Sequence, residues 1–317
     1  MVVCFLFVLS GEHLSLAQSE VEHLFNKEAR TTGEKLLLIN TTRQAILKKA
    51  PRLALTKSIH HVINIVDSTN LRKVLQALPP LKNTYKLSLY KETTRAPFLE
   101  ELSNAVYAQL KKPRVDLHTP QHHYTFFCTP RAVLLGEELY VNTDKPKERR
   151  AHLQIHNHPT AINPKFARTM INLANEKTIY DPFCGLGGII LEAKLMGVTA
   201  SGSDISQVMV EKAKENLAAY SCKAKLQVKD AKQLATKTDG IVTDLPYGKN
   251  SLLSEPIDML YKQFFIRAAK VTKKIVVCYS AAIDVKRLLY NTKWSIVESH
   301  ELYVHKSLTR VISVLEQ

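Results

Sequence analysis

A short acidic turn late in the chain has the residue types of a site that acts on an amino group. A strand-like run at 241–243 leads into the pentapeptide Asp244-Leu245-Pro246-Tyr247-Gly248. An exocyclic amino group of a base is a poor nucleophile because its lone pair is delocalised, and acceptors for both of its N–H groups localise that lone pair. We therefore predict that the Asp244 carboxylate and the Leu245 carbonyl are those acceptors, and that Pro246 fixes the backbone of the turn.

Tyr247 adds an aromatic surface to the same turn. A tyrosine there can stack on an extruded base, an interaction worth about 1–3 kcal/mol. The turn has no cysteine, so the sequence does not support the covalent mechanism used at carbon 5 of pyrimidines. In isolation the pentapeptide is equally typical of a β-turn after a buried strand. Its place after the fourth predicted strand, downstream of a matching cofactor turn, favours the catalytic interpretation.

A glycine-rich turn follows the strand predicted at 178–183, and it reads Asp181-Pro182-Phe183-Cys184-Gly185-Leu186-Gly187-Gly188. Glycines at the carboxyl end of a parallel strand let the backbone approach a ligand closely. The turn lacks the lysine of a phosphate-binding loop, and it does not spell a dinucleotide fingerprint. Asp181 would repel a pyrophosphate but favour a cationic sulfonium. The pattern therefore predicts S-adenosylmethionine (SAM) as the cofactor.

Two more acidic residues follow the next two predicted strands. Asp204 is suited to accept from the ribose hydroxyls of an adenosine, and Asp230 from the adenine amino group. Either residue alone could be a helix cap or a turn residue. Acids at successive strand ends favour a cofactor site, and the predicted cofactor-binding residues are Asp181, Phe183, Gly185, Gly187, Asp204, Ile205, Asp230 and Ala231.

The elements that must position these residues alternate between strand and helix. Strand-like segments lie at 178–183, 199–205, 224–229, 240–244 and 274–279, and helix-like segments at 188–196, 207–220, 256–271 and 282–290. This alternation is typical of a parallel α/β sheet. The last two strand-like segments, 294–305 and 308–315, are so closely linked that they must pair antiparallel. We expect a Rossmann-like α/β sheet that ends in an antiparallel hairpin.

The first 150 residues are less regular and predict a mixed α+β region. Short strands are expected at 5–9, 35–39, 61–66, 85–90, 124–128 and 132–138, and helices at 68–78 and 99–110. A charge run and three prolines within 144–164 indicate a linker. The apolar run at 2–9 has no preceding basic segment, so we interpret it as a buried strand rather than a signal sequence. No apolar run approaches the length of a membrane span.

The composition favours a polyanionic partner. The 44 Lys and Arg outnumber the 29 Asp and Glu, and 22 of the 44 lie in residues 1–160, so the charge is not a basic tail. Such a spread suits a long phosphate-tracking surface, and lysines kept for solubility explain it equally well. The five cysteines are scattered and include no C-x-x-C pair, which is typical of a reduced, cytoplasmic protein.

Cationic residues near the linker and the reaction turn are the predicted RNA contacts: Arg149, Arg150, Lys165, Arg168 and Lys249. For the pair at 149 and 150, an exposed solubility role is the alternative. Two groups of histidines, at 118, 122 and 123 and at 152, 156 and 158, raise the question of a metal. None has the glutamate of a zinc protease motif, so no metal is predicted and we interpret them as linker or RNA-facing residues.

The motifs resemble a known family. The turns at Asp181 to Gly188 and Asp244 to Gly248 resemble those of the Rossmann-like amino-methyltransferases. The segments His158 to Arg168 and His305 to Arg310 are similar to the archaeal tRNA guanosine-10 N2-methyltransferases. The resemblance is specific over about 145–317, and over the first half it is one of size, order and coarse pattern. Leu186 stands where that family often has a small polar residue, which should alter packing more than chemistry.

The resemblance implies four parts: a ferredoxin-like domain at 1–57, a THUMP domain at 58–144, a linker at 145–176 and a methyltransferase domain at 177–317. It implies SAM as the cofactor, tRNA as the partner and N2-methylguanosine as the product, with a second methylation left open. We expect a monomer, and an accessory protein subunit stays open.

Three other functions are alternatives for this sequence. One is a methyltransferase for guanosine 6 of tRNA, which has similar domains. Another acts on adenine N6 of DNA, and the additional N-terminal half argues against it. The third is a non-catalytic RNA-binding protein, and the intact Asp181, Asp204 and Asp244 argue against that.

Overall fold

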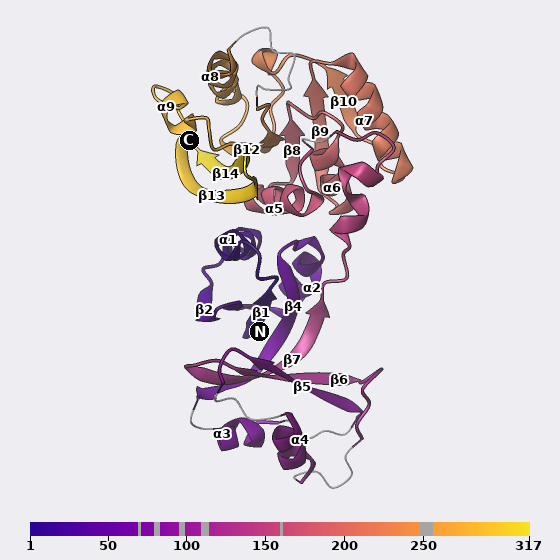
Figure 1. Cartoon of the computed structure of the whole chain (residues 1–317), viewed down its shortest axis with the longest axis vertical. Helices are drawn as coiled ribbons and strands as arrows, with labels where there is room; N and C mark the ends of the chain where they lie inside the picture. The colour runs from indigo at the N-terminus through magenta and orange to yellow at the C-terminus, as the bar shows by residue number, and fades with distance from the viewer. Residues whose placement is uncertain (69–70, 79–82, 95–98, 109–113, 159–160, 248–255) are drawn as a thin grey trace. The chain divides into compact units, whose positions relative to one another are not determined.

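A computed structural model of the chain describes residues 1–68, 71–78, 83–94, 99–108, 114–158, 161–247 and 256–317 (Figure 1). These residues form two compact units. Unit 1 comprises Met1–Pro51 and Leu55–Thr143, and unit 2 comprises Arg52–Ala54 and Asp144–Gln317. No helix among the described residues is long and apolar enough to cross a membrane.

Unit 1 is built on one seven-stranded sheet with the order β2-β3-β1-β4-β7-β6-β5. Its strands are β1 (Val2–Leu9), β2 (Arg30–Gly33), β3 (Leu36–Thr42), β4 (Thr56–Asp67), β5 (Tyr85–Lys91), β6 (His122–Cys128) and β7 (Ala132–Val141). Its helices are α1 (Leu14–Phe25), α2 (Arg43–Lys49), α3 (Leu71–Gln76) and α4 (Leu99–Tyr107), and the short 3-10 turn η1 (Ala50–Arg52) follows α2. The pair β5 and β6 is parallel, and the other neighbours are antiparallel.

Both faces of the sheet of unit 1 are covered, and successive side chains of a strand alternate between them. Phe126 of β6 packs with residues of α3 and α4, whereas its neighbour Phe127 packs with β1 and β3, as the two-residue period of a strand requires. The predicted boundary at 57/58 falls inside β4, which pairs with β1 and with β7. One sheet therefore runs through both predicted N-terminal parts, and their division into ferredoxin-like and THUMP domains stays a prediction.

Unit 2 holds a second seven-stranded sheet with the order β10-β9-β8-β11-β12-β14-β13. Its strands are β8 (Thr178–Asp181), β9 (Thr199–Asp204), β10 (Lys225–Val228), β11 (Gly240–Asp244), β12 (Lys274–Ser280), β13 (Ser295–His305) and β14 (Leu308–Glu316). The strands from β10 to β12 are parallel, and β14 is antiparallel to both β12 and β13. The predicted α/β sheet with a terminal antiparallel hairpin is confirmed.

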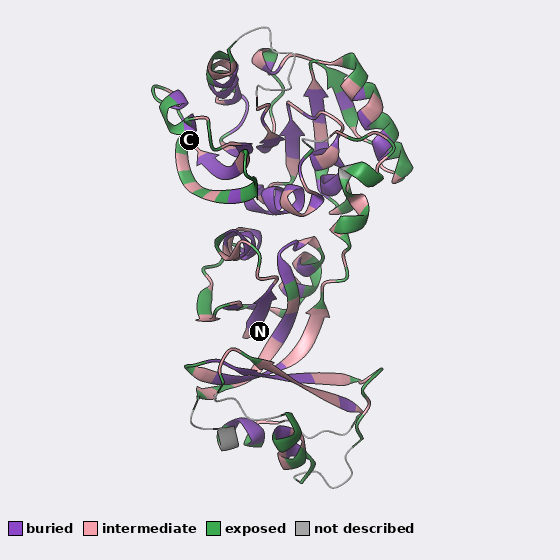
Figure 2. Cartoon of the chain, in the orientation of Figure 1, coloured by how far each residue is buried: buried purple, intermediate pink, exposed green. Residues whose placement is uncertain are grey.

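The helices of unit 2 cover the sheet. They are α5 (Pro164–Ala174), α6 (Gly188–Leu195), α7 (Gln207–Ala219), α8 (Ile257–Ala268) and α9 (Val285–Leu288), with 3-10 turns η2 (Pro146–Arg149), η3 (Ala151–Leu153) and η4 (Ala231–Gln233). Buried aromatic residues of α8, including Phe264 and Phe265, join Ile275 and Val277 of β12 in the main core. Figure 2 shows the central strands coloured as buried, which is expected for a parallel sheet with helices on both faces.

One helix lies where the sequence predicts a linker. Residues 145–176 include α5, which begins after Asn163, whose side chain accepts from the Lys165 amide as an N-cap. Its apolar residues Met170, Ile171 and Leu173 are fully buried. The segment is therefore part of the folded body of unit 2, and the three prolines that indicated a linker include Pro164 at the first helical position, which is where a proline is tolerated.

Candidate active site

The carboxyl ends of the parallel strands bring three acids to one edge of the sheet of unit 2. Asp181 ends β8, Asp204 ends β9 and Asp244 ends β11. Asp230 follows β10 at the same edge and caps η4 by accepting from the Lys232 amide at 2.8 Å. The geometry that the sequence predicts for these four residues is therefore present.

The glycine turn between β8 and α6 has an open backbone. Gly185 and Gly187 have φ angles of +48° and +83°, in the left-handed region that favours glycine. Apart from its chain neighbours, no heavy atom lies within 4 Å of the point where a Cβ of Gly185 would be. The turn is closed by the Gly187 amide, which donates to the Cys184 carbonyl at 2.7 Å. It leaves free space directly above the strand ends.

Asp204 fixes this turn from the end of β9. Its Oδ2 accepts from the Gly185 amide at 2.9 Å, and its Oδ1 accepts from the Ser206 amide at 2.9 Å. The next residue, Ile205, is 71% exposed at the same edge. Because a carboxylate oxygen has two acceptor positions, each Asp204 oxygen can still accept a hydroxyl of a ligand.

Asp181 is the most deeply buried acid of the site, with 1% of its surface exposed. Its Oδ1 accepts from the Thr243 hydroxyl at 2.6 Å and from the Phe183 amide at 3.1 Å. Burial raises the pKa of Asp181 to about 7, against the two hydrogen bonds that lower it. The nearby charges of Asp244 and Asp204 raise it further. A cation placed near this carboxyl favours its ionised form.

The other predicted cofactor residues lie around the same turn. Phe183 is half-buried and packs edge-on against Phe264 of α8, with ring centroids 5.3 Å apart. Ala231 is buried at the start of η4. The structure thus brings the whole predicted set to one edge of the sheet.

The reaction turn continues from β11. The Leu245 amide donates to the Cys278 carbonyl of β12 at 2.8 Å, which extends the sheet by one residue, and the Leu245 side chain is buried in the core. The Pro246 carbonyl accepts from the hydroxyl of Tyr261 at 2.9 Å, and the Tyr261 ring is fully buried in α8. The turn is therefore anchored on both sides.

Asp244 is surrounded by side chains from three elements. The Tyr247 hydroxyl donates to Asp244 Oδ1, and Arg310 Nη1 of β14 lies 3.6 Å from Oδ2. The Cys278 Sγ lies 3.8 Å from the Tyr247 hydroxyl. Burial raises the pKa of Asp244, while the Arg310 guanidinium and the Tyr247 hydroxyl oppose that rise. Both oxygens of the predicted acceptor thus have partners in the protein.

Sequence reasoning missed Arg310, Tyr261 and Thr243 as members of the site. Arg310 is buried and lies over the Tyr247 ring, with its Cζ 5.2 Å from the ring centroid. The one available signal was an arginine inside the apolar run of β14, where burial without a partner would be costly. Tyr261 and Thr243 gave no such signal, because both fit ordinary helix and strand positions.

The predicted RNA contacts fall into different environments. Arg149 and Arg168 lie in a buried ion cluster with Asp144 and Glu192: Arg149 Nε is 2.8 Å from Glu192 Oε1, and Arg168 Nη1 is 3.2 Å from Oε2. These guanidinium groups tie η2 and α5 to Glu192 of α6, which favours an architectural role over phosphate contact.

Arg150 is exposed and Lys165 is half-buried. Lys249, together with Gly248, lies outside the described residues.

Two of the histidines that raised the question of a metal pair with glutamates. His156 pairs with Glu215 at 2.6 Å, and His122 pairs with Glu137 at 2.7 Å. Over the part of the chain that the structure describes, no group of three or more His, Cys, Asp or Glu residues is placed to hold a metal ion.

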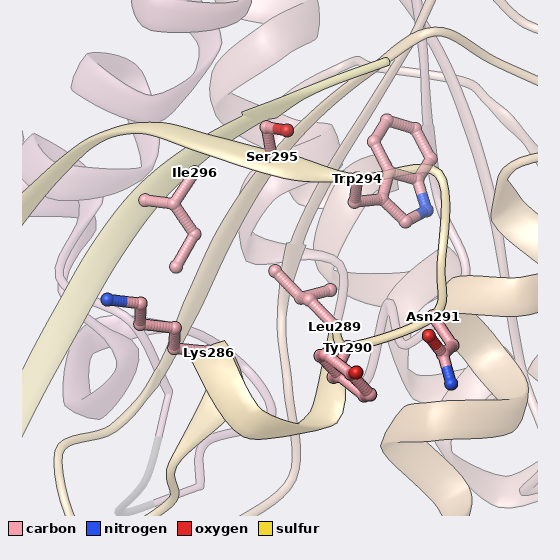
Figure 3. A pocket seen from close by; sticks show the side chains of 7 residues that line it. All are labelled: Lys286, Leu289, Tyr290, Asn291, Trp294, Ser295 and Ile296. Carbon is pink, nitrogen blue, oxygen red and sulfur yellow. The ribbon is translucent and has the colours of Figure 1, made fainter.

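A cavity of about 590 Å³ lies at the opposite end of the sheet (Figure 3). It is lined by Lys286, Leu289, Tyr290, Asn291, Trp294, Ser295 and Ile296. Ser295 is in register with Glu316, which is in register with Lys274, the first residue of β12. The cavity is therefore at the amino end of β12, whereas the acids lie at the carboxyl ends of the strands.

Comparison with known proteins places this geometry in a family. The model for RMKL-like methyltransferase domains matches residues 152–312. A tRNA (guanine(10)-N2)-dimethyltransferase of Methanothermobacter thermautotrophicus is 30% identical over 98% of this chain and 98% of its own length. The chain belongs to this family. It is accordingly a SAM-dependent tRNA guanine-N2 methyltransferase, and the predicted enzyme class and cofactor are confirmed.

A second relative agrees with this assignment, and a solved structure agrees with the fold. The tRNA (guanine(10)-N2)-dimethyltransferase of Pyrococcus abyssi is 31% identical over 64% of this chain and 64% of its own. The crystal structure of TrmN from Thermus thermophilus covers 99% of both chains with a TM-score of 0.55 and 18% identity, which is evidence for the fold.

The residues of the glycine turn fit the SAM of this family. The space above Gly185 and Gly188 leaves room for a ligand against the backbone. Asp204 has acceptor positions left for hydroxyl groups, and the Asp181 carboxyl has the chemistry to face a sulfonium.

Proposed function

We propose that this chain transfers methyl groups from SAM to N2 of guanosine 10 in tRNA, first giving N2-methylguanosine and then N2,N2-dimethylguanosine. The observation that carries this proposal is the Asp244 turn at the end of β11, in a chain similar over 98% of its length to a tRNA (guanine(10)-N2)-dimethyltransferase. SAM supplies the electrophilic methyl group, and the chain positions the nitrogen that receives it.

Asp244 and the Leu245 carbonyl are the proposed acceptors for the two N–H groups of the guanine. The anchors on either side support this role: Leu245 is held by Cys278, and Pro246 is held by Tyr261. A turn anchored in this way presents both acceptors with little movement of its backbone, and such preorganisation is where most of the electrostatic advantage of an active site arises. The nitrogen loses one proton during transfer, and the Asp244 carboxylate is placed to receive it.

Tyr247 is the proposed stacking partner for the base. In the structure its hydroxyl donates to Asp244 Oδ1, which is the atom that the guanine amino group needs. Base entry therefore exchanges one donor for another on the same oxygen. The aromatic ring then offers a stacking surface worth about 1–3 kcal/mol.

The second methylation makes a smaller demand on the acceptors. After one methyl group is added, N2 keeps a single N–H, so only one of the two acceptors is needed. The same turn therefore serves both steps, provided that the site has room for the first methyl group.

For tRNA contact, the exposed Arg150 is our first candidate and the half-buried Lys165 our second. Both lie close in sequence to the ion cluster of Arg149 and Arg168, which holds their segment on α6. Loss of either charge should weaken tRNA binding and reduce its salt dependence.

The test is methyl transfer from labelled SAM to unmodified tRNA. A matched tRNA with inosine in place of the target guanosine is the control, because inosine lacks only the 2-amino group. We expect label on the guanosine tRNA and none on the inosine tRNA. Equal labelling of both, or label on adenine of duplex DNA instead, would contradict the proposal.

A further inference from the structure

Arg310 is the one charged residue in the buried run at 310–315 of β14. Residues 310–315 of β14 are all buried, and the side chain of Arg310 is only 7% exposed. A buried guanidinium is retained only where a partner compensates its loss of water. Burial lowers the pKa of Arg310, but the nearby Asp244 carboxylate raises this pKa by more. The Arg310 guanidinium is therefore charged at any working pH.

The strand register explains why this charge reaches the reaction turn. Asp244 is in register with Cys278 of β12, and Cys278 is in register with Ile312 of β14. Arg310 lies two residues from Ile312, toward the carboxyl end of β12, where it is in register with Ser280. Its side chain therefore lies on the edge of the sheet that carries the acids.

The groups that face Asp244 come from every neighbouring element. Tyr247 belongs to the same turn, Cys278 to β12, Arg310 to β14, Asp181 to β8 and Tyr261 to α8. The Asp244 charge raises the pKa of Asp181 and of Tyr261, and Arg310, Tyr247 and Cys278 lower the pKa of Asp244, as their proximity requires. Among these five side chains, Arg310 supplies the positive charge.

We infer that Arg310 is a positioning residue for methyl transfer: it keeps Asp244 as a carboxylate and holds the Tyr247 ring beside it. The supporting geometry is the 3.6 Å approach to Asp244 Oδ2 and the 5.2 Å approach of Arg310 Cζ to the Tyr247 ring centroid. This inference rests on the proposed function, because it assigns Arg310 a role through Asp244 and gives it no contact with the substrate.

The consequence is a pH limit on transfer. A protonated Asp244 carries an O–H donor on the carboxyl that must accept from N2. Burial already pushes the pKa of Asp244 upward, and Arg310 opposes that push. Without Arg310, Asp244 should stay protonated to higher pH. Activity should then fall at neutral pH and return as the pH rises.

The experiment measures kcat for tRNA methylation against pH in the wild type, Arg310→Gln and Arg310→Lys. At low pH, kcat falls as Asp244 becomes protonated, and this acidic limb of the pH profile should move to higher pH in Arg310→Gln. On that limb we expect kcat to be about tenfold lower than in the wild type for each pH unit of the shift, and to recover at alkaline pH. Arg310→Lys keeps the charge and should shift the limb less. SAM affinity should stay within about twofold in both variants, because neither changes the glycine turn.

Arg287→Gln is the matched control. Arg287 also pairs with an aspartate, Asp258, at 2.6 Å, but that pair is exposed and lies outside the reaction turn. Its pH profile should be that of the wild type. A uniform loss of kcat in Arg310→Gln at every pH, with the acidic limb unmoved, would overturn the inference and leave Arg310 a packing residue.

A double-mutant cycle with Asp244→Asn decides the case even if Arg310→Gln does not fold. An asparagine keeps an acceptor oxygen but has no charge to stabilise. In the Asp244→Asn background, Arg310→Gln should lower kcat by no more than about threefold, since the two residues act as a pair. If the single variant is unfolded, refolding of the double variant supports the pairing, and a double variant that stays unfolded contradicts it.

The outcome for the wild type separates this inference from the proposed function. A wild type that transfers no methyl group to guanosine N2 removes the proposed function. If the wild type is active and the acidic limb of its pH profile lies at the same pH as that of Arg310→Gln, only the role of Arg310 is contradicted.

Discussion

The glycine turn and the reaction turn lie at the same edge of one sheet, yet they are held by different kinds of contact. The glycine turn is fixed by backbone amides: Asp204 accepts from Gly185 and Ser206, and Asp181 accepts from Phe183. The reaction turn has one backbone anchor, from the Leu245 amide to the Cys278 carbonyl, and its other contacts are side chains of remote elements, with Tyr261 on Pro246 and Arg310 beside Asp244. In the function we propose, the first arrangement would hold SAM, and the second would adjust the charge and position of the acceptor Asp244.

This difference predicts separable effects on binding and on transfer. A change in the glycine turn should weaken SAM binding, whereas a change in the reaction turn should slow transfer without affecting SAM. The four variants or conditions below test that separation, and each would weaken the comparison if binding and transfer changed together.

Asp244→Ala should have the largest effect. It removes the acceptor for N2, and we expect kcat to fall by about a thousandfold or more, within the range seen when a preorganised acceptor or donor is deleted. SAM affinity should stay within about twofold, as isothermal titration calorimetry would show. A parallel loss of SAM affinity would mean that Asp244 belongs to the cofactor half of the site.

Gly202→Val should show the opposite signature. A Cβ at Gly202 would lie 2.7 Å from the backbone carbonyl oxygen of Asp181, so β8 and β9 would have to separate at the base of the glycine turn. We expect a loss of roughly 1–3 kcal/mol in the free energy of unfolding and a SAM affinity lower by about tenfold to a hundredfold. Thermal unfolding and calorimetry measure the two effects. Unchanged SAM binding would show that the turn is not the cofactor site.

Tyr261→Phe should have an intermediate effect on transfer alone. It deletes the hydroxyl that donates to the Pro246 carbonyl and leaves the buried ring in place. We expect kcat to fall by about tenfold, and the free energy of unfolding by roughly 1 kcal/mol, because one hydrogen bond to a buried carbonyl is lost. Steady-state kinetics at saturating SAM is the measurement. A wild-type kcat would show that the turn needs no anchor from α8.

The pH dependence of SAM binding should be the smallest effect. Because the pKa of Asp181 is raised to about 7, its carboxyl is ionised above that pH and protonated below it. A cationic sulfonium binds the ionised form better, so the dissociation constant should rise by roughly threefold to tenfold between pH 8 and pH 6. Asp181→Asn is the control, since any pH dependence that it retains comes from SAM or from other groups of the protein. Identical profiles for the two proteins would remove Asp181 from cofactor recognition.

The same contrast explains what the sequence could and could not predict. The glycine turn, the acids after β8, β9 and β10, and the terminal hairpin are encoded by local pattern, because strand ends, glycines and closely spaced strands determine their own geometry. The roles of Arg310 and Tyr261 depend on strand register and helix packing. Those contacts join residues far apart in the chain, and residue type alone does not reveal them.

Charge was the least informative signal. Arg149 and Arg168 have the composition of phosphate contacts, but the structure places them in a buried cluster with Asp144 and Glu192. The sequence alone does not show whether an arginine is paired with a buried acid or faces solvent. The predicted boundary at 57/58 falls inside β4 for a related reason: the pairing of this single twelve-residue strand with both β1 and β7 is not visible in its own residues.

The most direct test of the proposed function is a time course of nucleoside mass spectrometry with site mapping, using the wild-type protein, SAM and unmodified tRNA. We expect N2-methylguanosine at position 10 first, followed by N2,N2-dimethylguanosine at the same position. Methylation at guanosine 6, methylation of an adenine, or no methylated nucleoside at all would contradict it.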